Sequence, residues 1–234
     1  MTKQEVAKMF LADERGVNKT EWFESRNTFN FGAYQHEHKQ PVGDIHVLND
    51  DILEGGRSYS MQVENEYTVY ILPVSGAVKF SIRSGNETLA VAGQVGVLSL
   101  KRGDIFTVSN PFSDQWVNLL QVWIKKNEQK ESTAALITFP NINDSLNQLT
   151  ALSEGADLYI GKFKGRGEAI FKTPDYDRQN FVFVVEGAFE VSGRLLHPRD
   201  GLVLYAQKET DIEALSNGAI LILISLPLNS HLPC

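Results

Sequence analysis

The stretch LNDDILEGGRSYSMQVENEYTVYILPVSGAVKFSIRSGNETLAVAGQVGVLSLKRGDIF, residues 48–106, decides the fold of this chain. Runs rich in β-branched and aromatic residues, such as Tyr67 to Leu72 and Ala77 to Ile82, predict strands. Turns containing Gly76, Gly85 and Gly103 separate these runs. Short strands with glycine turns at this density predict an all-β barrel or sandwich.

The second half of the chain repeats this pattern. The segment from Phe181 to Val191 matches that from Tyr70 to Phe80, since each has an apolar run, a glycine turn and an alternating strand. Ala92 to Leu98 is similar in the same way to Pro198 to Tyr205. We interpret the two halves as an internal duplication with low residue identity, and therefore as two similar barrels.

A charged connector, Lys125 to Ser132, marks the predicted domain boundary. The sequence therefore predicts one domain over residues 1–127 and a second over residues 128–234. Leucines at helical spacing, followed by Gly155, predict a short connecting helix near residues 141–153.

Composition limits the classes of function. The chain has 234 residues and a net charge of -7, which argues against direct binding to nucleic acid because that requires clustered Lys and Arg. A single cysteine, Cys234, excludes an intrachain disulfide. We see neither a signal peptide nor a membrane span in the sequence, so we expect a cytoplasmic protein with no membrane partner.

Four histidines are the first candidates for metal ligands. His36 and His38 would face the same way on a strand, but the residues around them are loop-like and solvated. His46 has the parity of an outward strand position, and His197 lies in a turn beside Pro198. We therefore expect no metal site at these histidines, and none in the second barrel.

Four segments of the first half stand out in order along the chain: Thr28 to Tyr34, Val47 to Asp51, Ser84 to Asn86 and Leu119 to Ile124. In order and spacing they resemble the signature segments of pirin-like bicupins. The resemblance is strong over about residues 13–125 and weaker beyond, where Ile222 to Pro227 resembles the end of bacterial members. It implies two tandem cupin barrels of the jelly-roll type.

The same resemblance implies a place for a metal. Metal-binding pirins hold iron or a similar ion in the first barrel through an H-x-H-x-x-x-E motif and one later histidine, and some resemble quercetin dioxygenases. Counted without gaps, these ligand positions fall on Gln62, Glu64, Thr68 and Phe106. An amide, one carboxylate, a hydroxyl and a phenyl ring are too poor a set to hold Fe(II). We therefore place the chain in a branch that lacks the metal-binding histidines and expect no metal cofactor.

Three interpretations of these four positions remain open. The side chains of Gln62, Glu64 and Thr68 would share strand parity, point into the barrel and refill a former metal cavity that Phe106 plugs. Alternatively, the cavity binds a small organic molecule, with Glu64 and Gln62 as polar anchors and Phe106 as an apolar wall. In the third, His36 or His38 would join Glu64 in a quercetin 2,3-dioxygenase-like site. We expect a regulatory role in binding a small molecule or a protein partner, with the oxygenase as the alternative.

Overall fold

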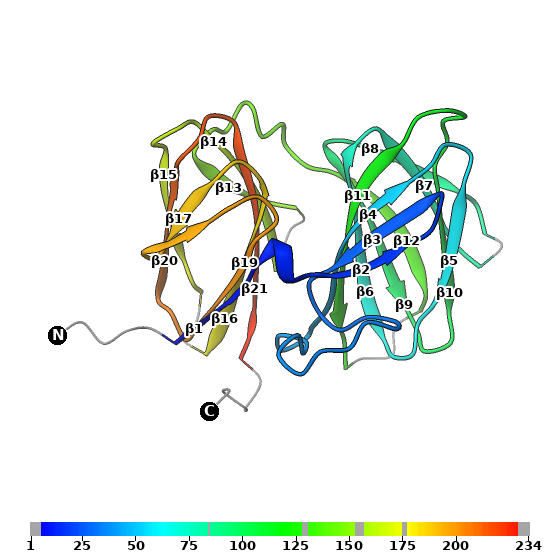
Figure 1. Cartoon of the computed structure of the whole chain (residues 1–234), viewed down its shortest axis with the longest axis horizontal. Helices are drawn as coiled ribbons and strands as arrows, with labels where there is room; N and C mark the ends of the chain where they lie inside the picture. Colours follow the sequence, from blue (N-terminus) through cyan, green and yellow to red (C-terminus); the bar gives the residue numbers. More distant parts are fainter. Residues whose placement is uncertain (1–5, 84, 128–130, 153–156, 175–176, 229–234) are drawn as a thin grey trace. The chain divides into compact units, whose positions relative to one another are not determined.

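The computed structural model describes residues 6–83, 85–127, 131–152, 157–174 and 177–228. Ser84, the first residue of the predicted second domain at position 128, and Cys234 therefore lie outside the described residues. The described residues form strands β1 to β21 and one short 3-10 helix, Ala12–Glu14 (Figure 1). None of the described helices is long and apolar enough to pass through a bilayer.

The chain divides into two compact units, each of which is an antiparallel β structure. The first unit is Arg15–Thr138, and the second combines Met1–Glu14 with Phe139–Cys234. This division differs from the predicted boundary between residues 127 and 128. Strand β12 (Thr133–Thr138) pairs with β9 (Gln94–Leu100) and so extends the first unit. Strand β1 (Ala7–Phe10) pairs with β19 (Gly201–Tyr205), so the N-terminal strand belongs to the second unit.

The first unit contains a seven-stranded sheet and a four-stranded sheet (Figure 1). An apolar core lies between them. The strand order is β12-β9-β6-β11-β4-β3-β2 in the larger sheet and β5-β10-β7-β8 in the smaller. The remaining strands of this unit are β2 (Gly16–Lys19), β3 (Phe23–Asn27), β4 (Ile45–Leu53), β5 (Ser58–Gln62), β6 (Tyr67–Ser75), β7 (Ala77–Ile82), β8 (Thr88–Val91), β10 (Ile105–Ser109) and β11 (Val117–Lys125).

The second unit repeats this plan. Its sheets have the orders β1-β19-β16-β21-β14-β13 and β15-β20-β17-β18. The strands not yet given are β13 (Gln148–Ala151), β14 (Leu158–Phe163), β15 (Glu168–Lys172), β16 (Arg178–Glu186), β17 (Phe189–Val191), β18 (Arg194–Leu196), β20 (Glu209–Ala214) and β21 (Ala219–Pro227). A core of buried Phe, Leu, Val and Ile side chains lies between these sheets.

The strand orders support the internal duplication. The order β9-β6-β11-β4 in one unit corresponds to β19-β16-β21-β14 in the other, and β5-β10-β7-β8 corresponds to β15-β20-β17-β18. The turns at equivalent places contain Gly76 and Gly187, with φ of 78° and 75°. A Cβ at Gly76 would lie 2.8 Å from Val117 Cγ1, and one at Gly187 would lie 2.4 Å from Ser216 Oγ. Both the backbone conformation and the space therefore favour glycine.

The predicted connecting helix near 141–153 is wrong for the residues that the structure describes there. Residues 142–147 form turns, and β13 then pairs with β14 at the edge of the sheet. Asn147 has a left-handed φ of 60°, and its Oδ1 accepts a hydrogen bond from the Lys164 backbone N at 2.9 Å. The leucine spacing fits a helix, but pairing with β14 satisfies the backbone as a strand instead.

Candidate functional site

The structure does not bring the four predicted site residues together. Gln62 is the last residue of β5, its side chain is exposed, and its Nε2 donates to the Gly103 carbonyl at 3.2 Å. Glu64 is exposed in the turn between β5 and β6. Thr68 lies between the core residues Tyr67 and Val69, and it therefore faces the opposite side of the sheet.

Phe106 is the only one of the four that lies inside the barrel. Its side chain is fully buried in the core of the first unit, and its ring packs edge-on against Trp123 with centroids 5.5 Å apart. The predicted shared parity of residues 62 to 68 fails because β5 ends at Gln62 and β6 begins only at Tyr67. Side-chain alternation holds within a strand and is not carried through the turn that joins two strands.

The four histidines that the structure describes form no alternative ligand set. His36 and His38 are exposed in the loop between β3 and β4, where the His38 backbone N donates to His36 Nδ1 at 3.2 Å and His38 Nε2 lies 3.1 Å from Glu37. His46 Nδ1 lies 3.1 Å from the Tyr67 hydroxyl. Burial, followed by the charge of Lys125, lowers the pKa of His46. His197 is exposed in the second unit.

The donor chemistry does not fit the metal that the fold family implies. Among the described residues, no three His, Cys, Asp or Glu side chains are grouped so that they could hold an ion. At the motif positions, an amide and a carboxylate face solvent while a phenyl ring fills the interior. Iron of the oxygenase type requires imidazoles and a carboxylate around one open position.

A buried polar cluster instead occupies part of the inner face of the large sheet. Strand β4 places Asn49 and Asp51 on this face, between the core residues Val47 and Leu53. Strand β11 adds Gln121, which lies directly across from Asn49. Strand β3 adds Ser25 and Asn27, opposite Asp51 and Asn49 respectively. These five side chains, all at most 1% exposed, are the polar cluster.

Two hydrogen-bond donors converge on one oxygen of Asp51. The Tyr59 hydroxyl donates to Asp51 Oδ2 at 2.9 Å, and Gln121 Nε2 donates to the same oxygen at 2.5 Å. The Gln121 carbonyl oxygen then accepts from Trp123 Nε1 at 3.1 Å. Elsewhere in the cluster, the Ser25 hydroxyl donates to Asn27 Oδ1 at 2.9 Å.

The environment of Asp51 changes its protonation. Burial raises its pKa to about 6, against the lowering effect of hydrogen bonds from Ser25, Gln121 and Tyr59. Burial and the neighbouring Asp51 carboxylate also raise the pKa of Tyr59 well above its ordinary value. The cluster can therefore hold a proton on Asp51 at a pH where an exposed aspartate has lost it.

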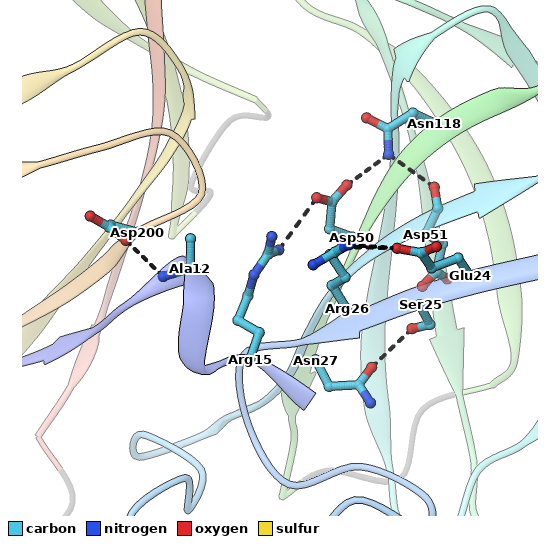
Figure 2. A network of polar contacts seen from close by, with 10 residues as sticks. All are labelled: Ala12, Arg15, Glu24, Ser25, Arg26, Asn27, Asp50, Asp51, Asn118 and Asp200. Carbon is cyan, nitrogen blue, oxygen red and sulfur yellow. Dashed lines mark hydrogen bonds and ion pairs between the residues drawn. The ribbon is translucent and has the colours of Figure 1, made fainter. Parts of the chain in front are cut away.

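The neighbouring aspartate has a different environment because successive residues of a strand point to opposite faces. Asp50 lies on the other face of the sheet, where Arg15 Nη1 is 3.3 Å from its Oδ2 and Asn118 Nδ2 donates to its Oδ1 at 2.7 Å (Figure 2). Asn118 also donates to the Asp51 carbonyl at 3.0 Å. Asp50 thus has an arginine and an amide as partners, whereas the Asp51 side chain is bound only by neutral donors.

The polar cluster was not predicted, although the sequence contains a signal for it. In β4 the apolar alternation of Val47 and Leu53 is interrupted at the inward positions 49 and 51, and in β11 Gln121 stands between Leu119 and Trp123. A polar residue two positions from buried apolar residues on the same strand points to the same face as they do. Such residues therefore indicate polar groups inside the core.

A cleft lies on the second unit, between strands β13 and β14 and strand β15. Its volume is about 390 Å³, and at its lining Tyr159 packs against Phe171 with ring centroids 4.9 Å apart. The other lining residues are Asn147, Gln148, Leu149, Ala169, Ile170 and Lys172. Its volume falls at the lower end of the range for small-molecule sites, but it is an open cleft and not an enclosed cavity.

Known proteins resemble this chain in sequence and in fold. Residues 143–225 match the family described as the quercetinase C-terminal cupin domain. A curated quercetin 2,3-dioxygenase of Escherichia coli K12 is 24% identical over 228 residues, covering 92% of this chain and 96% of that protein. The pirin-like protein YhaK of the same strain is 27% identical over 135 residues, covering 58% of this chain and 57% of its own length.

A solved structure, that of the bacterial pirin YhhW from Escherichia coli in complex with nickel(II), superimposes with a TM-score of 0.80 at 21% identity. It covers 96% of this chain and 100% of that chain. Two barrels of one plan, a cupin domain match in the second half and relatives along most of the length agree with one another. Residues 143–225 thus match a cupin domain, and along most of its length this chain is similar to pirin-like proteins and quercetin 2,3-dioxygenases.

Proposed function

We propose that this protein acts by binding, in a regulatory role, and not as a metal-dependent dioxygenase. The observation that carries the proposal is the position of Phe106, whose ring fills the interior of the first barrel where the family motif calls for a histidine ligand. Gln62 and Glu64 are exposed, so water competes with a metal ion for both side chains, and they would bind such an ion only weakly.

A protein partner is the ligand that the first unit supports best. Phe106, Phe80 and Trp123 lie together in its core, so a phenyl ring occupies the place where the pocket between Gln62 and Phe106 was predicted. An organic or protein ligand of this unit would therefore bind on its surface. Exposed apolar side chains on this unit, such as Trp116 at 48% and Ile105 at 43%, offer contact area of the kind found at the centre of interfaces.

A small molecule is a second candidate ligand, in the cleft of the second unit. The packed rings of Tyr159 and Phe171 and the half-buried Leu149 would contact an apolar planar compound, and Gln148 and Asn147 would supply hydrogen bonds. This cleft differs from the predicted pocket, which lay in the first barrel.

Oxygen uptake distinguishes binding from oxygenation. The native chain, purified without a metal-affinity tag and then incubated with Fe(II) or Ni(II), should consume no oxygen in the presence of quercetin. The Escherichia coli quercetin 2,3-dioxygenase, treated in the same way, is the positive control. Quercetin-dependent oxygen consumption by the native chain at a rate proportional to its metal content would overturn the proposal.

Two further assays separate the two kinds of ligand. Cross-linking in cells should capture one protein whose yield saturates at a fixed ratio to this chain, and the yield should fall in a Trp116→Asp variant. For the cleft, a set of planar aromatic compounds is screened by thermal shift. An Ile170→Asp variant alters the lining, while Leu195→Asp on the same sheet lies outside the cleft and is the matched control. If neither assay finds a saturable ligand, the binding role is refuted.

A further inference from the structure

Three side chains of the polar cluster carry atoms that no protein group satisfies. Within the part of the chain that the structure describes, Asn27 Nδ2, Asn49 Nδ2, Asn49 Oδ1 and Asp51 Oδ1 are buried and have no hydrogen-bond partner, because the Ser25 hydroxyl, which is close enough to Asp51 to lower its pKa, donates its one proton to Asn27 Oδ1. Asn27 and Asp51 are 0% exposed and Asn49 is 1% exposed. Buried polar atoms are nearly always paired in folded proteins, so four unpaired atoms in one cluster require an explanation.

These atoms come from positions that are neighbours on one face of one sheet. Asn27 on β3 lies directly across from Asn49 on β4, and Ser25 lies across from Asp51. Residues 49 and 51 are two apart on the same strand and therefore point to the same side. Side chains directly across from one another on adjacent strands are within contact distance. The unpaired atoms thus belong to one patch inside the first barrel.

The unpaired atoms include both hydrogen-bond donors and acceptors, and this mixture determines which ligand fits. Asn27 Nδ2 and Asn49 Nδ2 are donors, while Asn49 Oδ1 and Asp51 Oδ1 are acceptors. Exchanging the nitrogen and oxygen of Asn49 would interchange a donor and an acceptor and leave both unpaired. Exchanging those of Asn27 would let its amide nitrogen donate to Ser25 Oγ and free the Ser25 proton for Asp51, but the Asn27 oxygen would then lose that proton and the two Asn49 atoms would be unaffected. A donor and acceptors therefore remain unpaired after either exchange.

We propose that the first barrel contains an internal water site, formed by Asn27, Asn49 and Asp51. A metal cation would satisfy the two acceptors but would face the amide donors, and an anion would face the Asp51 carboxylate. Water donates and accepts at once, and a buried water molecule commonly makes about three hydrogen bonds to otherwise unpaired groups. This site is separate from Gln62, Glu64 and Thr68, which lie outside the barrel, and it does not depend on the proposed function.

Two measurements on the native protein test the proposal directly. A crystal structure at a resolution that separates ordered solvent should show spherical density within hydrogen-bond distance of Asn49 and of Asp51 Oδ1. Oxygen-17 magnetic relaxation dispersion should detect water with a long residence time in the protein. A dry site in the crystal structure would overturn the proposal, and so would density too large or too extended for water.

A pair of variants assigns the relaxation signal to this site. Asn49→Leu removes one donor and one acceptor, and we expect the amplitude of the long-lived water signal to fall by at least one water molecule per chain. Asn65→Leu, at an exposed position in the turn between β5 and β6, should leave the amplitude unchanged. An unchanged amplitude in a folded Asn49→Leu protein would contradict the assignment. If Asn49→Leu does not fold, the crystal density at Asn49 and Asp51 decides alone.

Discussion

Replacing Asp51 by asparagine should remove most of one pH-dependent component of stability in the first unit. In the folded chain, the carboxyl group of Asp51 is buried, and its pKa is raised from 3.8 to about 6. Asparagine has the same shape, and its amide oxygen can still accept hydrogen bonds from Tyr59 and Gln121. It cannot carry the charge that burial disfavours, so the comparison isolates the ionisation of Asp51.

The sign and the size follow from linkage. Below pH 3.8 the group is protonated in both the folded and the unfolded chain and has no effect. Between pH 3.8 and about 6 the unfolded chain releases this proton while the folded chain retains it, so stability falls as pH rises. A shift of about two pKa units makes the loss about 3 kcal/mol at pH 7.5. The stability of Asp51→Asn relative to the native chain should therefore rise by about 3 kcal/mol between pH 3.5 and pH 7.5.

Urea unfolding followed by tryptophan fluorescence measures this difference in the right part of the chain. All three tryptophans, Trp22, Trp116 and Trp123, lie in the first unit, so the signal reports its unfolding. Asp114→Asn, at an exposed position of the same unit, controls for the loss of one negative charge. A difference between Asp51→Asn and the native chain that stays constant from pH 3.5 to pH 7.5 would refute the argument, because Asp51 would then ionise equally in both states.

The other predictions concern the expected site positions in the first barrel. Phe106→Ala should lower the free energy of unfolding by about 3–5 kcal/mol, because the ring is fully buried against Trp123, whereas Ile105→Ala at the preceding, 43% exposed position should cost no more than about 1 kcal/mol in the same urea titration. Equal losses for the two variants would mean that Phe106 is not a core residue. Gln62→Ala combined with Glu64→Ala should change the free energy of unfolding by less than about 1 kcal/mol, since both side chains are exposed. A loss of several kcal/mol would mean that these side chains lie in the barrel interior.

Much of the fold could be predicted from alternation and turn residues. The glycine turns and the repeated patterns predicted two barrels, and the corresponding strand orders agree with that prediction. The boundary could not be placed in this way, because β1 and β12 join their sheets by pairing with strands far away in the sequence. The helix near 141–153 was predicted from leucine spacing alone, which cannot reveal that β14 is available as a pairing partner.

The site was harder to predict than the fold. Counting from the family motif gave positions 62, 64, 68 and 106, but which of them face inward depends on where β5 ends, and strand ends are poorly marked in this sequence. The polar cluster was not predicted because its members come from three separate strands, β3, β4 and β11. Only the pairing of these strands brings Asn27, Asn49 and Gln121 into one row. Asparagine and glutamine also occur commonly in turns, so they do not by themselves indicate a buried position.

The metal content of the native chain tests the central claim most directly. The chain is purified without a metal-affinity tag, dialysed to equilibrium against Fe(II) or Ni(II) and separated from unbound ion. Its metal content is then measured by inductively coupled plasma mass spectrometry. We predict metal far below one equivalent per chain, because Phe106 fills the barrel interior and Gln62 and Glu64 face solvent. One tightly held ion per chain, with anomalous scattering inside the first barrel, would contradict the account.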